Sequence, residues 1–127
     1  MIRKIVLLSA LFTSQAFAAD YDLKSAMKQM KLDFKQAAEA QSVEEMQTAI
    51  DSFSRLITQS QSAAYPPEKQ NLYIEGFNKL SLSIEAINQE LQQGDLKGAK
   101  QELKVIDGLR EEYHDKRNPS IWSKIFG

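Results

Sequence analysis

The feature that most constrains this chain is a repeated spacing of apolar residues. The clearest example spans residues 73–91, where the intervals are 4, 3, 4, 3 and 4 and the residues are Tyr73, Phe77, Leu80, Ile84, Ile87 and Leu91. Such intervals place every member on one face of an α-helix, because a helix turns once in about 3.6 residues. A half-buried strand would instead alternate with a period of two, and the repeated windows show no such alternation.

Three other windows carry the same kind of stripe. The first contains Leu23, Met27, Met30, Phe34, Ala37 and Gln41, with Lys24, Lys28, Lys31 and Lys35 off the stripe. The second contains Met46, Ala49, Ile50, Phe53, Leu56 and Ile57. The last contains Leu96, Ala99, Leu103, Ile106, Arg110 and Tyr113 with His114. The sequence therefore predicts four amphipathic helices, each with one inward face.

Helix-starting residues precede the first two windows. Asp20 or Asp22 is positioned to cap the first helix. Ser42 and Glu45 form the pattern of a capping box, in which Ser42 accepts a hydrogen bond from a first-turn amide and Glu45 reaches back to the cap.

Helix-ending residues separate the later windows. Pro66 and Pro67 disfavour helical geometry before them, so the second helix should stop by about Ser62. Gly94 is suited to a left-handed terminator, and Asp95 can cap the fourth helix. Because the connections are short, consecutive helices should be antiparallel neighbours. We expect an all-α, up-down-up-down antiparallel four-helix bundle.

The beginning of the chain has the character of an export signal. Arg3 and Lys4 precede a short apolar run that ends in the small-x-small sequence Ala16-Phe17-Ala18. The run is too short to span a bilayer securely, so we expect cleavage after residue 18 and a periplasmic mature protein. No later segment is long and apolar enough to cross a membrane. The expected domains are a signal peptide at 1–18, a bundle at 19–117 and an amphipathic tail at 118–127.

Composition excludes several classes of function. The chain has no cysteine, which excludes covalent c-type haem attachment and thiolate metal sites. Removal of the signal takes away two of the 16 basic residues and none of the 17 acidic ones, which leaves a formal charge of −3. That balance is poor for binding nucleic acid.

Two side chains stand out as candidate metal ligands. His114 is the sole histidine. Taken alone, it is explained as a residue interacting with the dipole at a helix end. Met27 alone is explained as a core filler. In the predicted topology, however, the start of the first helix and the end of the fourth lie together, with Met27 about 7.5 Å and His114 about 5 Å in from these ends. A thioether and an imidazole facing each other across a bundle form the axial pair of a haem with a raised reduction potential.

Large flat side chains are predicted at the same end of the bundle. Phe34, Phe53, Tyr73 and Phe77 come from three helices, and the Pro66-Pro67 turn lies over them. Aromatic residues of this kind can simply fill a core. Together with the axial pair, they are suited to form the walls of a porphyrin site.

Four segments, in order along the chain, resemble the soluble cytochrome b562 family. They are the Leu23-to-Phe34 stripe with its methionine four residues after the first leucine, Pro66-Pro67, Tyr73-Ile74-Glu75-Gly76-Phe77, and Arg110-Glu111-Glu112-Tyr113-His114. The resemblance implies one non-covalent b-type haem, with Met27 and His114 as axial ligands. It further implies contacts to the haem from Met30, Phe34, Pro66, Tyr73 and Phe77.

The expected function is therefore electron transfer with periplasmic redox partner proteins, by a monomer that is not an enzyme. With both axial positions filled, the iron has no open site for a substrate. Arg110, one turn before His114, either tunes the charge near the porphyrin or extends its stem over the core. The tail at 118–127 either folds over the haem end or contacts a partner or a membrane surface.

Two alternative functions are consistent with parts of the sequence. A haem-free helical binding or stress protein could retain the bundle, but its sequence should have lost the axial pair, and both members are present. A di-iron carboxylate enzyme needs Glu-x-x-His on two helices, and one histidine cannot supply that pattern.

Overall fold

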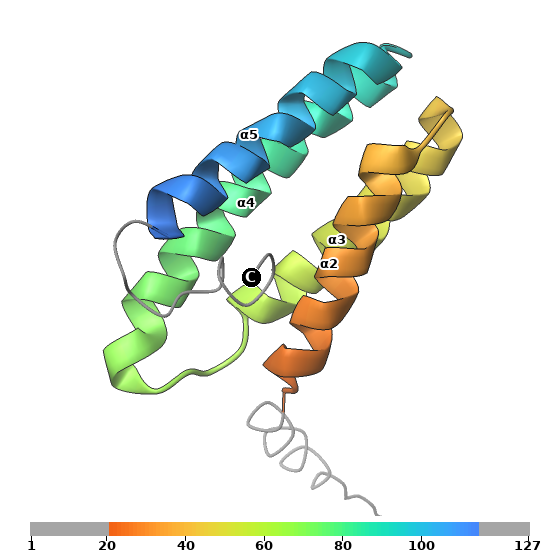
Figure 1. Cartoon of the computed structure of the whole chain (residues 1–127). Coiled ribbons are helices and arrows are strands. Elements are labelled where there is room, and N and C mark those ends of the chain that lie inside the picture. The colour runs from red at the N-terminus through yellow and green to blue at the C-terminus, as the bar shows by residue number, and fades with distance from the viewer. Residues whose placement is uncertain (1–20, 115–127) are drawn as a thin grey trace, which may run out of the picture.

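Four helices make up the part of the chain that the computed structural model describes, which is residues 21–114 for the backbone and 21–109 for side chains. They are α2 (Leu23–Glu39), α3 (Val43–Gln61), α4 (Pro67–Gln92) and α5 (Leu96–His114). Two antiparallel hairpins, α2–α3 and α4–α5, pack together through α3 and α4 (Figure 1). The predicted all-α, up-down-up-down bundle is confirmed. The predicted signal peptide at 1–18 and the tail at 118–127 lie outside the described residues.

Helix α2 begins where a side chain satisfies its first free amide. The Asp22 carboxylate accepts hydrogen bonds from the Ser25 amide at 3.1 Å and from the Ser25 hydroxyl at 2.6 Å. Those bonds lower the pKa of Asp22 below its ordinary value. The helix ends at Glu39 because Ala40 is extended, and the helical periodicity stops there. The prediction that Gln41 faces inward is therefore wrong: Gln41 is exposed, and Ala40 is buried instead.

Helix α3 begins with the predicted serine cap. The Ser42 hydroxyl accepts from the Glu45 amide at 3.0 Å. The Glu45 carboxylate reaches back to the amide of Gln41, the residue before the cap, at 3.4 Å. The predicted reciprocal arrangement is thus present with its second bond displaced by one residue. The helix ends at Gln61 with Ser62 as its C-cap, as predicted.

Two prolines start helix α4 and a glycine ends it. Pro67 occupies the first helical position, where its lack of an N–H leaves no hydrogen bond unmade. Gly94 has a φ of 75°, in the left-handed region, so the Asp95 amide can donate to the Glu90 carbonyl at 2.9 Å. Asp95 then caps α5 by accepting from the Gly98 amide at 2.8 Å. The end of α4 before Gly94 and the cap at Asp95 were predicted, whereas the two prolines were predicted only to end the preceding helix.

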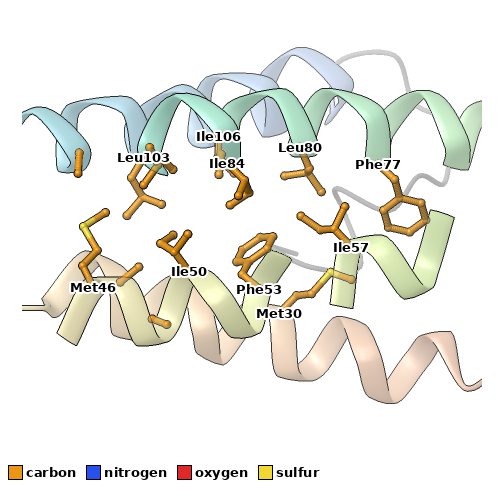
Figure 2. Close-up of a cluster of buried hydrophobic side chains, with 14 of the residues drawn as sticks. Met30, Met46, Ile50, Phe53, Ile57, Phe77, Leu80, Ile84, Leu103 and Ile106 are labelled. Atoms are coloured by element: carbon orange, nitrogen blue, oxygen red, sulfur yellow. The ribbon is translucent and has the colours of Figure 1, made fainter. Parts of the chain in front are cut away.

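The core lies along the axis of the bundle and receives side chains from all four helices (Figure 2). All six members of the predicted α4 stripe are buried. The largest side chains with less than 2 % exposure are Phe53, Phe77, Met30, Met46, Ile50, Ile57, Leu80, Ile87 and Ile106. Since each buried aliphatic or aromatic side chain contributes about 1.5–3 kcal/mol, this shared core is the main source of stability.

Polar contacts identify which flank of each helix meets which neighbour. The buried Asp33 of α2 accepts from the Ser52 hydroxyl of α3 at 2.7 Å, and from Gln29 on its own helix at 3.0 Å. Gln47 of α3 donates to Asn88 of α4 at 3.0 Å. The contact between α2 and α5 is the least extensive of those between neighbouring helices. The seam between the first and last helices of the bundle is thus the most open one.

Replacing Gly94 by Ala should lower the free energy of unfolding by about 1–2 kcal/mol, because a Cβ in the left-handed region costs that much. No atom lies within 4 Å of the position that the new Cβ would occupy, so the cost is one of backbone conformation alone. Urea unfolding followed by far-UV circular dichroism measures it.

Gly108→Ala is the matched control. Gly108 is exposed within α5, and it also has open space around the added Cβ. Because Ala is the better residue inside a helix, this change should raise the free energy of unfolding by about 0.5–1 kcal/mol. Shifts of the same sign in both variants would contradict the role assigned to Gly94.

Candidate functional site

A pocket of about 360 Å³ opens at the start of α2. Among the described residues it is lined by Leu23, Lys24, Met27 and Lys28. Met27 is only 2 % exposed, Leu23 is half-buried, and both lysines are exposed. The pocket therefore has an apolar wall and a cationic rim.

The phase of α2 decides which methionine reaches this pocket. The cap at Asp22 fixes where the helix starts, and Met27 follows on the flank opposite to the one that carries Asp33. Met30 lies one turn further on, is fully buried and belongs to the core cluster (Figure 2). It does not line the pocket. Of these two candidates, the structure brings Met27 to the pocket.

The other proposed ligand comes from the end of α5. Helix α2 begins and helix α5 ends at the same end of the bundle (Figure 1). Arg110 and His114 belong to the last turns of α5, but their side chains lie outside the described residues. The backbone topology is the one that the pairing requires, and the meeting of Met27 with His114 stays a prediction.

Three aromatic rings gather at this end of the bundle. The Tyr65 and Tyr73 ring centroids lie 5.2 Å apart in an edge-to-face arrangement, and those of Tyr65 and Phe77 lie 6.2 Å apart. Tyr73 and Phe77 are buried, whereas Tyr65 is half-buried. Edge-to-face pairs of this kind add about 0.5–1.5 kcal/mol beyond the area that they bury. The rings hold the α3–α4 connection against the start of α4.

Hydrogen bonds to Ser60 of α3 hold both this connection and the residue that precedes Asp22 at the start of α2. The Tyr65 hydroxyl donates to the Ser60 carbonyl at 2.6 Å, and the Tyr21 and Ser60 hydroxyl oxygens are 2.8 Å apart. Ser60 itself is fully buried. The pKa of Tyr65 is raised to about 12, mainly because burial disfavours its charged form and secondly because Tyr21 is close by. The tyrosine is therefore neutral at every physiological pH.

The two remaining residues predicted to contact the haem differ in solvent exposure. Phe34 is half-buried and packs against the core, while Pro66 is exposed. Pro66 contributes through its backbone: its carbonyl accepts from the amides of Lys69 and Gln70 at 2.9 and 3.0 Å, which starts α4. Its effect on the site is to fix the connection that carries Tyr65.

The donor set at this end favours one class of metal centre. Within residues 21–109, no group of three or more His, Cys, Asp or Glu side chains is placed to hold a metal ion. A thioether in an apolar pocket is a soft donor, which suits haem iron and is unsuited to Ca²⁺ or Mg²⁺. The Met27 thioether and the apolar wall of the pocket are therefore compatible with haem iron.

Comparison with known proteins agrees with this chemistry. The family model described as cytochrome b562 matches residues 22–118. The chain belongs to the cytochrome b562 family. No curated protein and no solved structure matches the chain. Members of the cytochrome b562 family are haem-binding electron carriers with a b-type haem, typically periplasmic and generally not enzymes. The resemblance in the sequence is thereby confirmed.

Sequence reasoning missed the roles of several residues in this structure. Tyr65 was overlooked because it falls between helices, where no periodicity marks a buried side. The buried carboxylate of Asp33 was missed because its position next to the stripe gives no sign of a serine on α3. Lys24 and Lys28 were identified as lying off the stripe, but nothing in their spacing showed a pocket beside them. A tyrosine directly before a diproline was the one available signal.

Tyr65→Phe should lower the free energy of unfolding near neutral pH by about 1 kcal/mol, because the Ser60 carbonyl loses its hydroxyl donor. Since folding raises the Tyr65 pKa from about 10 to about 12, the unfolded chain loses this proton first as pH increases. The stability of the unmodified protein should therefore fall more steeply than that of the variant between pH 10 and 12. Urea unfolding across that range tests this, and parallel curves would contradict the burial of Tyr65.

Proposed function

We propose that the mature chain is a periplasmic electron carrier that binds one non-covalent b-type haem between Met27 and His114. The observation that carries the proposal is the position of Met27. It is buried, it lines the pocket at the end where α2 begins and α5 ends, and it belongs to a cytochrome b562 family member. When bound, the haem iron supplies one-electron chemistry.

The periodicity of α5 supports the partnership of His114. Ala99, Leu103 and Ile106 are buried at intervals of 4 and 3. Extending the same intervals along the helix leads to residue 110 and then to residues 113–114. A histidine at that point is suited to face the pocket from the opposite side to Met27.

Each proposed site residue has a role that follows from its chemistry. The Met27 thioether favours the reduced metal, and neutral His114 supplies the second donor. The family resemblance assigns apolar contacts with the haem to Phe34, Tyr73, Phe77 and Met30, although in the structure these residues pack in or against the core and do not line the pocket beside Met27. Arg110, one turn before His114, places a positive charge beside the site. Because His114 must be neutral to bind, acid should loosen the cofactor.

Location and partners belong to the same proposal. We infer export from the basic, apolar and small-x-small order of residues 1–18, which is typical of a signal peptide. In the part of the chain that the structure describes, no helix has the length and apolar character to span a bilayer. The redox partners would be other periplasmic proteins, with the cytochrome acting as a monomer.

The central test is haem titration of the purified mature protein, followed by spectra of the oxidised and reduced forms. The unmodified protein should give sharp low-spin bands. Met27→Leu, which keeps the apolar volume but removes the thioether, should lose them, and so should His114→Ala. Met46→Leu is the matched control, because Met46 is equally buried but does not line the pocket. Its spectrum should be unchanged.

Two outcomes would contradict the proposal. A folded protein that retains no haem would favour the haem-free helical protein. Low-spin bands that survive in Met27→Leu would assign the axial position to another residue. Circular dichroism of every variant checks that the helices are intact.

The reduction potential gives an independent prediction. Lys24 and Lys28 line the same pocket as Met27, and positive charge near the iron favours the reduced state. The double variant Lys24→Gln, Lys28→Gln should lower the potential, on the order of a few tens of millivolts at low salt, since exposed charges are partly screened. Redox titration measures it. An unchanged or higher potential at low salt would show that these lysines do not act on the haem.

A further inference from the structure

Two rows of lysines run along the first and last helices of the bundle. On α2 the row has intervals of 4, 3 and 4, and on α5 it has intervals of 3 and 4. The members are Lys24, Lys28, Lys31, Lys35, Lys97, Lys100 and Lys104. Six are exposed and Lys100 is half-buried. Helical spacing makes each row a straight stripe along its helix.

The structure shows which way the α2 row faces. Asp33 lies on the flank that contacts α3, through its bond to Ser52. At about 100° per residue, the lysine row is roughly 160° around the helix from Asp33. The lysine row lies on the same flank of α2 as Met27. This flank is opposite to Asp33 and is directed toward α5. The lysines therefore border the α2–α5 seam and not the α2–α3 interface.

The α5 row borders the same seam from the other side. A Cβ added at Gly98 would meet the Glu90 carboxylate of α4, so Gly98 marks the flank toward α4. Lys100 and Lys104 lie well over 90° around the helix from Gly98, on the side away from α4. In Figure 1, α2 lies in front of α3 and α5 lies in front of α4, so both α2 and α5 are on the side toward the viewer. Both lysine rows thus belong to one surface, which we term the basic face.

The excess of carboxylates lies on α3 and α4, whereas α5 has four basic and four acidic residues, of which Asp107 continues the line of its lysine row. Helix α2 has four lysines and two acidic residues, of which Asp33 is buried. Helices α3 and α4 together have seven acidic and three basic residues. Within residues 21–109, no ion pair of 4 Å or less occupies a lysine of the basic face. Helix α2 therefore carries an excess of positive charge and helices α3 and α4 an excess of negative charge, although the mature chain has a formal charge of −3 overall.

The basic face is hollowed in two places. One hollow is the pocket lined by Met27, Lys24 and Lys28. The other, of about 470 Å³, runs beside Leu96 and three lysines of α5. The cationic surface therefore continues from the proposed haem site toward the far end of the bundle.

We propose that the basic face docks the acidic surface of a redox partner protein. A cationic face of this extent steers an oppositely charged partner and raises its rate of encounter. The orientation that it selects brings the partner to the seam that holds Met27, which shortens the path for an electron. This functional purpose rests on the haem site proposed above, whereas the docking itself depends on the lysines alone.

An acidic protein suits this face better than an anionic lipid surface. Stable attachment to a membrane needs apolar side chains that insert between the lipids. Among the described residues, the large exposed apolar side chains are Leu32, Leu82 and Val105. None of the three is on a lysine row or lines either hollow. The face offers charge without an apolar anchor.

The test compares two triple variants of the haem-loaded mature protein. The first is Lys31→Gln, Lys35→Gln, Lys104→Gln on the basic face, with residues that do not line the Met27 pocket. The second is Arg55→Gln, Lys69→Gln, Lys79→Gln on α3 and α4. Both remove three positive charges, so an effect of net charge alone would be equal. Calorimetric titration with poly-L-glutamate, as a probe for an acidic surface, measures the affinity at several salt concentrations.

We expect the unmodified protein to bind poly-L-glutamate and to release it as salt rises. The basic-face variant should bind about tenfold more weakly, because each exposed ion pair is worth a factor of roughly two, and the control should change by at most about twofold. Oxidation of the reduced protein by anionic hexacyanoferrate(III) should be slowed more in the basic-face variant than in the control variant. Equal losses in the two variants would overturn the proposal. So would binding to phosphatidylglycerol vesicles without binding to poly-L-glutamate.

The haem-free protein separates this proposal from the preceding one. If the chain retains no haem, the proposed function fails, but titration of the same variants with poly-L-glutamate still measures docking. If haem binds normally and both triple variants behave alike, the docking proposal alone fails.

Discussion

Burial of one apolar face per helix is the interaction on which the rest of this structure depends. Its effect is set by where each helix begins, because the start fixes which residues face inward. Asp22, Ser42 and the Pro66-Pro67 pair each define such a start. Moving the first helix by one residue would rotate Met27 by about 100° and take it away from the pocket. The capping residues therefore determine the candidate site as directly as they determine the fold.

The four seams of the bundle are not equivalent, and the difference explains where the site lies. Polar pairs such as Asp33 with Ser52 and Gln47 with Asn88 join α2 to α3 and α3 to α4. The seam between α2 and α5 has the least extensive contact. It is also the one bordered by Met27 and by both rows of lysines. A seam that is not closed by its own side chains can receive a flat cofactor, and cations along its edges leave it accessible to an acidic partner.

Periodicity predicted the fold well because burial is local to each helix face. Every residue of the α4 stripe is buried, and the ends of α3 and α4 fall where Ser62 and Gly94 placed them. The wrong prediction for Gln41 has a local cause too. The helix ends before that residue, so the helical spacing no longer places it on the inward face. Tyr65 and Asp33 could not be predicted in this way, because their partners lie on other elements. Spacing along one helix contains no information about what a neighbouring helix presents.

The same limit applies to the choice among the methionines. Met27, Met30 and Met46 all lie on predicted stripes, and all three are buried, so neither periodicity nor burial separates a ligand from a core residue. What separates them is position along the bundle and around the helix. All three belong to the core cluster, but of the three only Met27 also lines the pocket at the start of α2. A thioether becomes available to a metal only where packing leaves space beside it, and that space is a property of the assembled helices.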